Sequence, residues 1–163
     1  MENVKAVVFD WGDTLMRDFS EFQGPMAYWP RVEVVAGVVD ILKQLHRQLM
    51  CCVASNAGDS DAELMGLALA RGHIRHYFHC LFTSRELRAA KPDPVFFREI
   101  LRKLEVEPQE CVMVGDDYLK DIVPAKSVDM WTVWFSEAPV TIPTPCADVV
   151  INSMKDLVTA IRI

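Results

Sequence analysis

Short apolar runs alternate along the chain with longer segments whose apolar positions recur at helical spacing. The runs are rich in β-branched residues and end at polar or turn-forming residues, which is typical of buried strands. The predicted strands lie at 4–9, 50–54, 79–83, 111–114, 130–135 and 148–151. The predicted helices lie at 34–49, 59–70, 94–104, 118–126 and 153–161.

Local signals at several helix boundaries support this assignment. Pro94 suits the first turn of the helix that it opens. A side-chain oxygen of Asp59 or Ser60 can accept a hydrogen bond at the start of an earlier helix. Pro124 falls inside the segment 118–126, and because proline lacks an N–H it must lie early in that helix or kink it.

The alternation of strands and helices predicts the fold class. Parallel strands joined by helical crossovers form an α/β, three-layer, doubly wound sheet that is mainly parallel. The length of 163 residues is typical of one domain, and the 51% apolar content is enough to cover both faces of a buried sheet. We therefore expect a single domain over residues 1–163, with irregular structure at 12–30 and in the proline-rich loop 137–145.

Charge and cysteine content restrict the classes of function. The formal net charge is −6, which argues against a nucleic-acid or anionic-membrane binder because both need a basic surface. Neither a signal peptide nor an apolar stretch approaching the ~18 residues of a membrane span is visible. The five cysteines contain no C-x-x-C pair, and Cys51, Cys52 and Cys111 fall in predicted strands. Reduced, buried thiols and a cytoplasmic location are expected.

Chemically active residues follow several of the predicted strands. Ligands of such sheets collect outside the carboxyl ends of the strands, near the point where strand order reverses. The residues at these ends, and the lysine before the third helix, are Asp10, Ser55, Asn56, Lys91, Asp116 and Asp117. Carboxylates from two strands can hold Mg²⁺, and a carboxylate can attack phosphorus. A hydroxyl and a lysine can hold phosphate oxygens.

Four segments resemble, in order, the four motifs of the haloacid dehalogenase (HAD) superfamily. VVFDWGDTL is similar to the first motif, a strand that ends in D-x-D-x-T. CCVASNAGD resembles the second, AAKPDP the third and CVMVGDDYLKDIVPAK the fourth. Together these segments span residues 4 to about 127, which is most of the chain.

The resemblance implies a phosphate monoester hydrolase that uses Mg²⁺ and an aspartyl-phosphate intermediate. Asp10 would be the nucleophile and a metal ligand, and Asp116 the second carboxylate on the metal. Asp121 would support the metal shell through water or Lys91. The backbone carbonyl of Gly12 would also face the metal.

The same resemblance implies the residues that hold the substrate. Ser55 would bind the phosphoryl group, and Asn56 beside it is a further candidate. Lys91 would neutralise the nucleophile and the phosphate. The expected partner is a phosphorylated substrate, either small or macromolecular, and a homo-oligomer is possible. Neither a nucleic acid nor a membrane is expected as a partner.

One position departs from the family pattern. Phosphatases of the family carry a second aspartate two residues after the nucleophile, where this chain has Gly12; an acid occurs one residue later, at Asp13. Asp13 could take the acid–base role, or the protein could be a slow hydrolase that relies on Asp10, metal and solvent. It could also be an inactive binding or regulatory protein. Dehalogenases of the family lack the second aspartate too. Their chemistry, however, is associated with a site that a cap domain encloses and that contains a halide-binding arginine.

The intervals between the motifs are too short for a cap domain. We therefore expect a capless class, with residues 15–33 as a flap or minimal cap. Residues 19–30 are rich in aromatic side chains. Packing over the sheet edge is the favoured role of this segment, and a lid or partner surface is the alternative.

Overall fold

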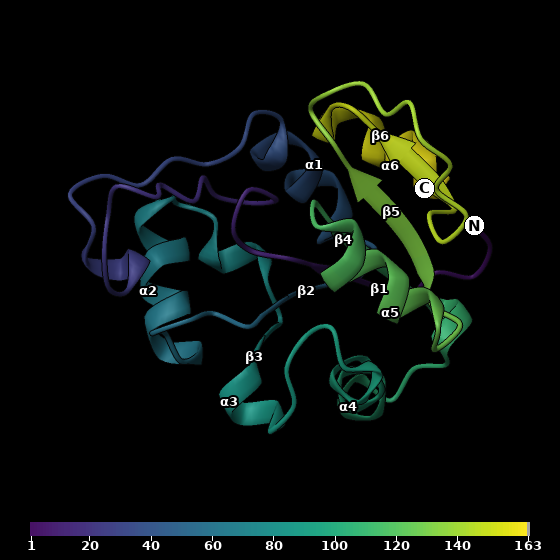
Figure 1. Ribbon diagram of the computed structural model, residues 1–163, viewed down its shortest axis with the longest axis horizontal. Helices are drawn as coiled ribbons and strands as arrows, with labels where there is room; N and C mark the ends of the chain where they lie inside the picture. Colours follow the sequence, from purple (N-terminus) through teal and green to yellow (C-terminus); the bar gives the residue numbers. More distant parts are fainter. Residues whose placement is uncertain (163) are drawn as a thin grey trace.

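The computed structural model describes residues 1–162 and contains a six-stranded parallel sheet (Figure 1). The strands are β1 (Ala6–Phe9), β2 (Met50–Ser55), β3 (Cys80–Thr83), β4 (Cys111–Gly115), β5 (Trp131–Phe135) and β6 (Val149–Ile151). Their order across the sheet is β3-β2-β1-β4-β5-β6. The predicted fold class and all six predicted strands are confirmed.

The strand order places the end of β1 at the centre of one sheet edge. Phe9 is in register with Val53 of β2 on one side and with Val114 of β4 on the other. After β3 the chain crosses to the opposite side of β1 to form β4, so the order reverses at β1. The residues that follow β1, β2 and β4 therefore meet at one place, where ligands of such sheets bind.

Helices cover both faces of the sheet. The longer ones are α1 (Val38–Leu45), α2 (Ala62–Arg71) and α4 (Pro94–Leu104), and the short ones are α3 (Ser84–Leu87), α5 (Val123–Lys126) and α6 (Leu157–Ile161). Single 3₁₀ turns occur at η1 (Met26–Tyr28), η2 (Arg75–Tyr77), η3 (Pro108–Glu110) and η5 (Met154–Asp156). In Figure 1, α1 and α6 lie on one side of the sheet, and α3 and α4 lie on the other.

The side chains of β1 alternate between two apolar cores. Val7 and Phe9 pack into the core formed with α1, α2 and α6, whereas Ala6 and Val8 pack into the core formed with α4 and α5. All four are fully buried, as expected for a central parallel strand that is covered on both faces. β1 is thus fixed from both sides, and the residue that follows it is held at the sheet edge.

Two predicted helix starts are wrong. The helix expected over 34–49 spans only Val38–Leu45, because Gly37 adopts a left-handed conformation at φ 86°. Val34 instead forms a β-bridge with Met16. At α2 the N-cap is neither Asp59 nor Ser60 but Asp61, whose carboxylate accepts a hydrogen bond from the backbone of Leu64.

The segment 118–126 is not one regular helix. A π-helical turn, η4 (Tyr118–Ile122), precedes α5, and the N–H of Val123 bonds back to the carbonyl of Tyr118. Pro124 lies in the first turn of α5, where a missing N–H costs no helical hydrogen bond. The expectation that Pro124 would lie early in a helix is correct, but the helix that contains it is much shorter.

The segment Phe19–Pro30, called the flap below, packs against α2. The rings of Phe19, Phe22 and Trp29 form one aromatic cluster. The guanidinium of Arg71 donates to the carbonyl oxygens of Ala27 and Trp29, at 2.9 and 2.7 Å. Trp29 also belongs to the apolar core that lies against α1, α2 and α6, so the flap is held to the body of the protein by both apolar and polar contacts.

Two further predictions concern burial and hydropathy. Cys51, Cys52 and Cys111 are buried, free thiols, as expected, and burial raises the pKa of Cys51 and of Cys111 to about 12. Over the described residues, the structure has no helix with the length and apolar character needed to span a bilayer.

Candidate active site

A cavity of about 770 Å³ opens at the edge of the sheet where β1, β2 and β4 end. Residues that follow these three strands line one part of it, and flap residues line another. The predicted site residues Asp10, Gly12, Asp13, Ser55, Asn56, Lys91, Asp116 and Asp121 all line this cavity. The structure therefore brings together side chains that lie more than a hundred residues apart in the sequence.

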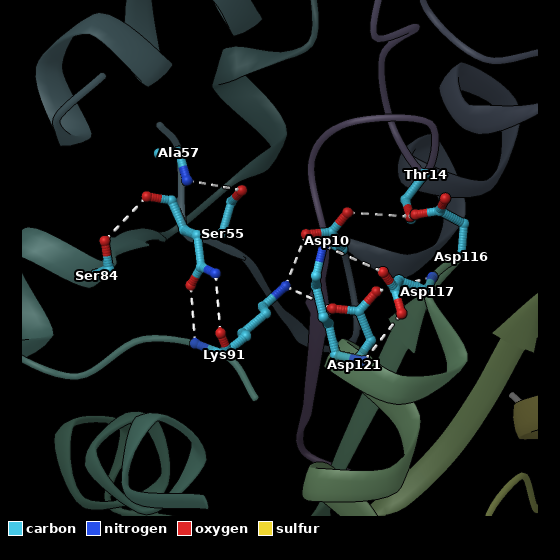
Figure 2. A network of polar contacts seen from close by, with 11 residues as sticks. Asp10, Thr14, Ser55, Ala57, Ser84, Lys91, Asp116, Asp117 and Asp121 are labelled. Carbon is cyan, nitrogen blue, oxygen red and sulfur yellow. Dashed lines mark hydrogen bonds and ion pairs between the residues drawn. The ribbon is translucent and has the colours of Figure 1, made fainter. Parts of the chain in front are cut away.

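Lys91 lies at the centre of the polar cluster (Figure 2). Its ammonium group donates to Oδ1 of Asp10 at 2.6 Å and to Oδ1 of Asp121 at 2.7 Å. The side chain is only 3% exposed. Although burial acts to lower the pKa of Lys91, the two carboxylates outweigh it and raise that pKa. Lys91 is thus a buried ammonium ion that fixes the orientation of two carboxylates.

Thr14 and Asp116 complete the opposite side of Asp10. The hydroxyl of Thr14 lies 3.0 Å from Oδ1 of Asp116 and 3.4 Å from Oδ2 of Asp10. Burial and the nearby Asp10 raise the pKa of Asp116 to about 6. Burial also raises the pKa of Asp121, although Lys91 opposes the shift. The cluster therefore contains more negative charge than its single ammonium neutralises.

The donor set fits a hard divalent cation. Carboxylate oxygens of Asp10, Asp116 and Asp121 lie within 4.8 Å of one another, and Mg²⁺ is usually held by one or two carboxylates together with water and phosphate. Both oxygens of Asp121 are already engaged, Oδ1 by Lys91 and Oδ2 by the N–H of Asp117. Within residues 1–162, Asp116 has one oxygen without a hydrogen bond, and Oδ2 of Asp10 has only the long contact with Thr14 at 3.4 Å. These two oxygens are the ones least occupied by hydrogen bonds in the cluster.

Gly115 allows Asp121 to approach the end of β4. A Cβ at this position would overlap the carboxylate of Asp121, so only glycine leaves room for that side chain. Neither Gly115 nor Thr14 was predicted as a site residue. Both belong to segments singled out from the sequence, since Thr14 is the threonine of D-x-D-x-T and Gly115 precedes Asp116.

The residues after β2 approach the cavity in two different ways. Oγ of Ser55 accepts a hydrogen bond from the N–H of Ala57, which orients the hydroxyl at the start of the loop. The Asn56 side chain is bonded on both sides to the backbone of Lys91: its Oδ1 accepts from the N–H at 2.8 Å and its Nδ2 donates to the carbonyl at 3.0 Å. Ser84 donates to the carbonyl of Asn56 (Figure 2). Asn56 thus joins the loop after β2 to the loop between α3 and α4, which carries Lys91.

The loop after β1 places two further carboxylates at the cavity. Asp13 adopts a left-handed conformation at φ 54°, and its Oδ1 accepts a hydrogen bond from the N–H of Asp18. Asp18 also lines the cavity, and burial together with Asp13 and Asp10 raises its pKa. Asp18 was not among the predicted site residues. The role of Asp13 in proton transfer stays a prediction.

Comparisons with known proteins agree on the family. Residues 16–129 match the family model of the haloacid dehalogenase-like hydrolases. A glyceraldehyde 3-phosphate phosphatase of Methanopyrus kandleri is 45% identical over 65 residues, which cover 40% of this chain and 28% of that protein. The human haloacid dehalogenase-like hydrolase domain-containing protein 3 is 33% identical over 113 residues, covering 69% of this chain and 42% of that protein. The matches thus span less than half the length of these relatives.

Solved structures extend the similarity to nearly the whole chain. An uncharacterised protein from Listeria monocytogenes serotype 4b superposes with a TM-score of 0.82 and covers 98% of this chain and 100% of that one. Its sequence is 22% identical, so this comparison bears on the fold alone. The family model covers well over half of the 163 residues, and this chain belongs to the haloacid dehalogenase-like hydrolase family.

Proposed function

We propose that this protein is a Mg²⁺-dependent phosphate monoester hydrolase that acts through an aspartyl-phosphate on Asp10. The observation that carries the proposal is the geometry around Asp10. Its Oδ1 is held by the buried ammonium of Lys91, and its other oxygen faces Asp116 across Thr14. One carboxylate is thereby oriented for attack, beside a second that can share a cation.

Each residue of the cluster has a task in the first chemical step. Asp10 attacks phosphorus, and Lys91 stays close enough to balance the charge that gathers on the phosphoryl oxygens. The Ser55 hydroxyl and the N–H groups of the loop after β2 bind those oxygens. Mg²⁺, when bound by Asp10 and Asp116, with the carbonyl of Gly12 as a further ligand, supplies charge neutralisation between nucleophile and phosphate.

The substrate class is a phosphorylated compound, either small or macromolecular. The M. kandleri relative carries the name of a phosphatase, and the cavity of about 770 Å³ is large compared with a phosphoryl group. The proposal includes one domain over 1–163, in which residues 15–33, which contain the flap, form a minimal cap. Phe22 and Trp29 of the flap line the cavity and would contact the part of the substrate beyond the phosphate.

Gly12 favours one alternative function. A glycine at this position supplies no carboxyl for proton transfer to the leaving group, and general acid–base catalysis is typically worth about 10²–10⁴-fold in rate. A protein with an intact phosphate pocket but no such group would bind phosphorylated ligands with little turnover. A catalytically weak or inactive binding protein is therefore the second candidate.

The deciding experiment is hydrolysis of p-nitrophenyl phosphate with Mg²⁺ and with EDTA, for the parent and for Asp10→Asn. The proposal expects turnover that requires Mg²⁺ and disappears in Asp10→Asn. Saturable Mg²⁺ and phosphate binding without turnover of aryl or alkyl phosphates would support the binding protein instead. Equal turnover with EDTA would exclude the metal-dependent mechanism.

A further inference from the structure

Hydrolysis through an aspartyl-phosphate requires a group that moves protons, and the central cluster leaves none free. The leaving oxygen needs a proton, and the attacking water must lose one. Asp10 is the nucleophile, and Asp116 is assigned to the metal in the proposed function. Lys91 holds two carboxylates, and Asp121 accepts hydrogen bonds from both Lys91 and Asp117. The proton-transfer group must therefore come from the periphery of the cavity.

Four other carboxyl groups line the cavity, and two of them have structural tasks. They are Asp13, Asp18, Asp59 and Asp117. Oδ1 of Asp117 accepts from the N–H groups of Leu119 and Lys120 and so caps the π-helical turn. Oδ1 of Asp13 accepts from the N–H of Asp18 and so closes the loop after β1. These hydrogen bonds tie both groups to the backbone.

Asp18 is placed against the loop that carries the nucleophile. A Cβ built on Gly12 would lie 3.4 Å from Cβ and 3.5 Å from Oδ2 of Asp18. The space beside the backbone two residues after Asp10 is thus occupied by a carboxyl group from position 18. Within residues 1–162, no group donates a hydrogen bond to this carboxyl, and it remains accessible from the open cavity.

The backbone at Asp18 is held at its own N–H and at the preceding residue. The preceding residue, Arg17, makes two hydrogen bonds to the carboxylate of Glu137, at 2.7 and 2.6 Å, and its N–H bonds to the carbonyl of Glu33. The N–H of Asp18 itself bonds to Asp13. Because three contacts fix this turn, the Asp18 side chain is presented to the cavity from an anchored backbone.

We propose that Asp18 is the residue that transfers protons in the reaction, in place of a side chain at position 12. This inference rests on the proposed function. In the first step Asp10 forms a bond to phosphorus as the bond to the leaving oxygen breaks, and the Asp18 carboxylic acid gives its proton to that oxygen. In the second step water attacks the phosphorus as the bond from phosphorus to Asp10 breaks, and the water gives a proton to the Asp18 carboxylate. Phosphate leaves, and Asp10 and the acid form of Asp18 are restored.

The test compares Asp18→Asn with Asp13→Asn and with Asp59→Asn, a control that removes another carboxyl lining the cavity. Each variant and the parent are assayed with Mg²⁺ on p-nitrophenyl phosphate and on ethyl phosphate, which has a much poorer leaving group. Asp18→Asn should lose about 10²–10⁴-fold in turnover of ethyl phosphate. The loss on p-nitrophenyl phosphate should be smaller because nitrophenolate leaves without a proton. Asp59→Asn should behave as the parent.

A rescue experiment separates catalysis from packing. Asp18→Ala should lose activity on ethyl phosphate, and the double variant Gly12→Asp, Asp18→Ala should recover part of it by presenting a carboxyl to the same space. The φ of Gly12 lies outside the left-handed region, so an aspartate is compatible with the backbone. Thermal unfolding of each variant checks that the fold is intact. If the double variant is folded but recovers no activity, the idea that carboxyls from positions 12 and 18 occupy the same space is contradicted.

The outcomes distinguish this inference from the function on which it rests. If turnover needs Asp10 but Asp18→Asn keeps the parental rates on both substrates, the role of Asp18 is overturned while the hydrolase stands. If Asp13→Asn rather than Asp18→Asn shows the selective loss on ethyl phosphate, Asp13 is the proton-transfer group. If the parent itself has no turnover, both proposals fall.

Discussion

The ammonium nitrogen of Lys91 lies 2.6 Å from Oδ1 of Asp10 and 2.7 Å from Oδ1 of Asp121. Lys91 lies in the loop between α3 and α4, Asp10 follows β1, and Asp121 lies in the π-helical turn after β4. A single buried cation therefore ties together three separate parts of the chain. The same contacts that orient the proposed nucleophile also contribute to stability.

Replacing Lys91 by Met should destabilise the protein strongly. The change leaves the carboxyls of Asp10 and Asp121 buried without their shared cation, and breaking a buried ion pair in this way typically costs about 3–5 kcal/mol. Urea unfolding in EDTA measures the loss. The double variant Lys91→Met, Asp121→Asn should lose less, because one of the two stranded charges is removed. A double variant that is less stable than Lys91→Met alone would contradict this account.

Asn56→Ala should reduce turnover because Asn56 positions Lys91, and not because Asn56 touches the reacting atoms. The change removes both hydrogen bonds to the Lys91 backbone and should cost roughly 1–3 kcal/mol of stability. Asn152→Ala is the matched control, since the Asn152 amide also donates to two backbone carbonyls, those of Ser136 and Ala138. Because the Asn152 contacts are exposed, Asn152→Ala should lose less stability than Asn56→Ala and keep the parental kcat. Equal effects of the two variants on kcat would remove the positioning role of Asn56.

Asp116 should make the metal-free protein less stable as pH rises from about 4 to about 6. Its pKa is raised from the ordinary 3.8 to about 6, so within this window the folded state binds more protons than the unfolded state, and the free energy of unfolding falls with increasing pH. Urea unfolding in EDTA across the window should show this fall in the parent and a weaker one in Asp116→Asn. Added Mg²⁺ should restore stability at neutral pH. The same pH slope in both proteins would exclude Asp116 as its source.

Arg71→Met should loosen the flap. The variant loses the hydrogen bonds from the guanidinium to the carbonyls of Ala27 and Trp29, and these partly buried contacts should be worth about 1 kcal/mol in total. Limited proteolysis should cut residues 19–30 faster than in the parent. Arg102→Met is the control, because within residues 1–162 Arg102 pairs only with Glu99, on the exposed face of α4. Equal cleavage in the two variants would show that Arg71 does not hold the flap.

The strands were predictable because each is a short apolar run, and the central strands β1 and β4 are fully buried between the helices on the two faces of the sheet. The start of α1 was not, since it depends on the left-handed Gly37 and on the bridge between Val34 and Met16. The cap of α2 was ambiguous because three successive residues, Asp59, Ser60 and Asp61, all offer a suitable oxygen. Such choices depend on how distant parts of the chain meet.

The sequence was sufficient to predict which residues lie together in the site. It was less informative about the contacts that these residues make. Asp10, Lys91 and Asp116 follow from strand ends and from the family resemblance. The hydrogen bonds of Asn56 to the Lys91 backbone join loops 35 residues apart and leave no sequence pattern. Asp18 was missed because nothing in the sequence shows that the loop after β1 folds back onto Gly12.

The most direct measurement is the trapping of the covalent intermediate. The parent is mixed with Mg²⁺ and a phosphate monoester, quenched in acid within the first turnover, and digested for mass spectrometry. The account predicts one added phosphoryl group on the peptide that contains Asp10, absent from Asp10→Asn and from samples with EDTA. Mg²⁺-dependent hydrolysis with no phosphoryl group on Asp10, under conditions in which the intermediate is trapped from a known aspartyl-phosphate enzyme, would contradict it.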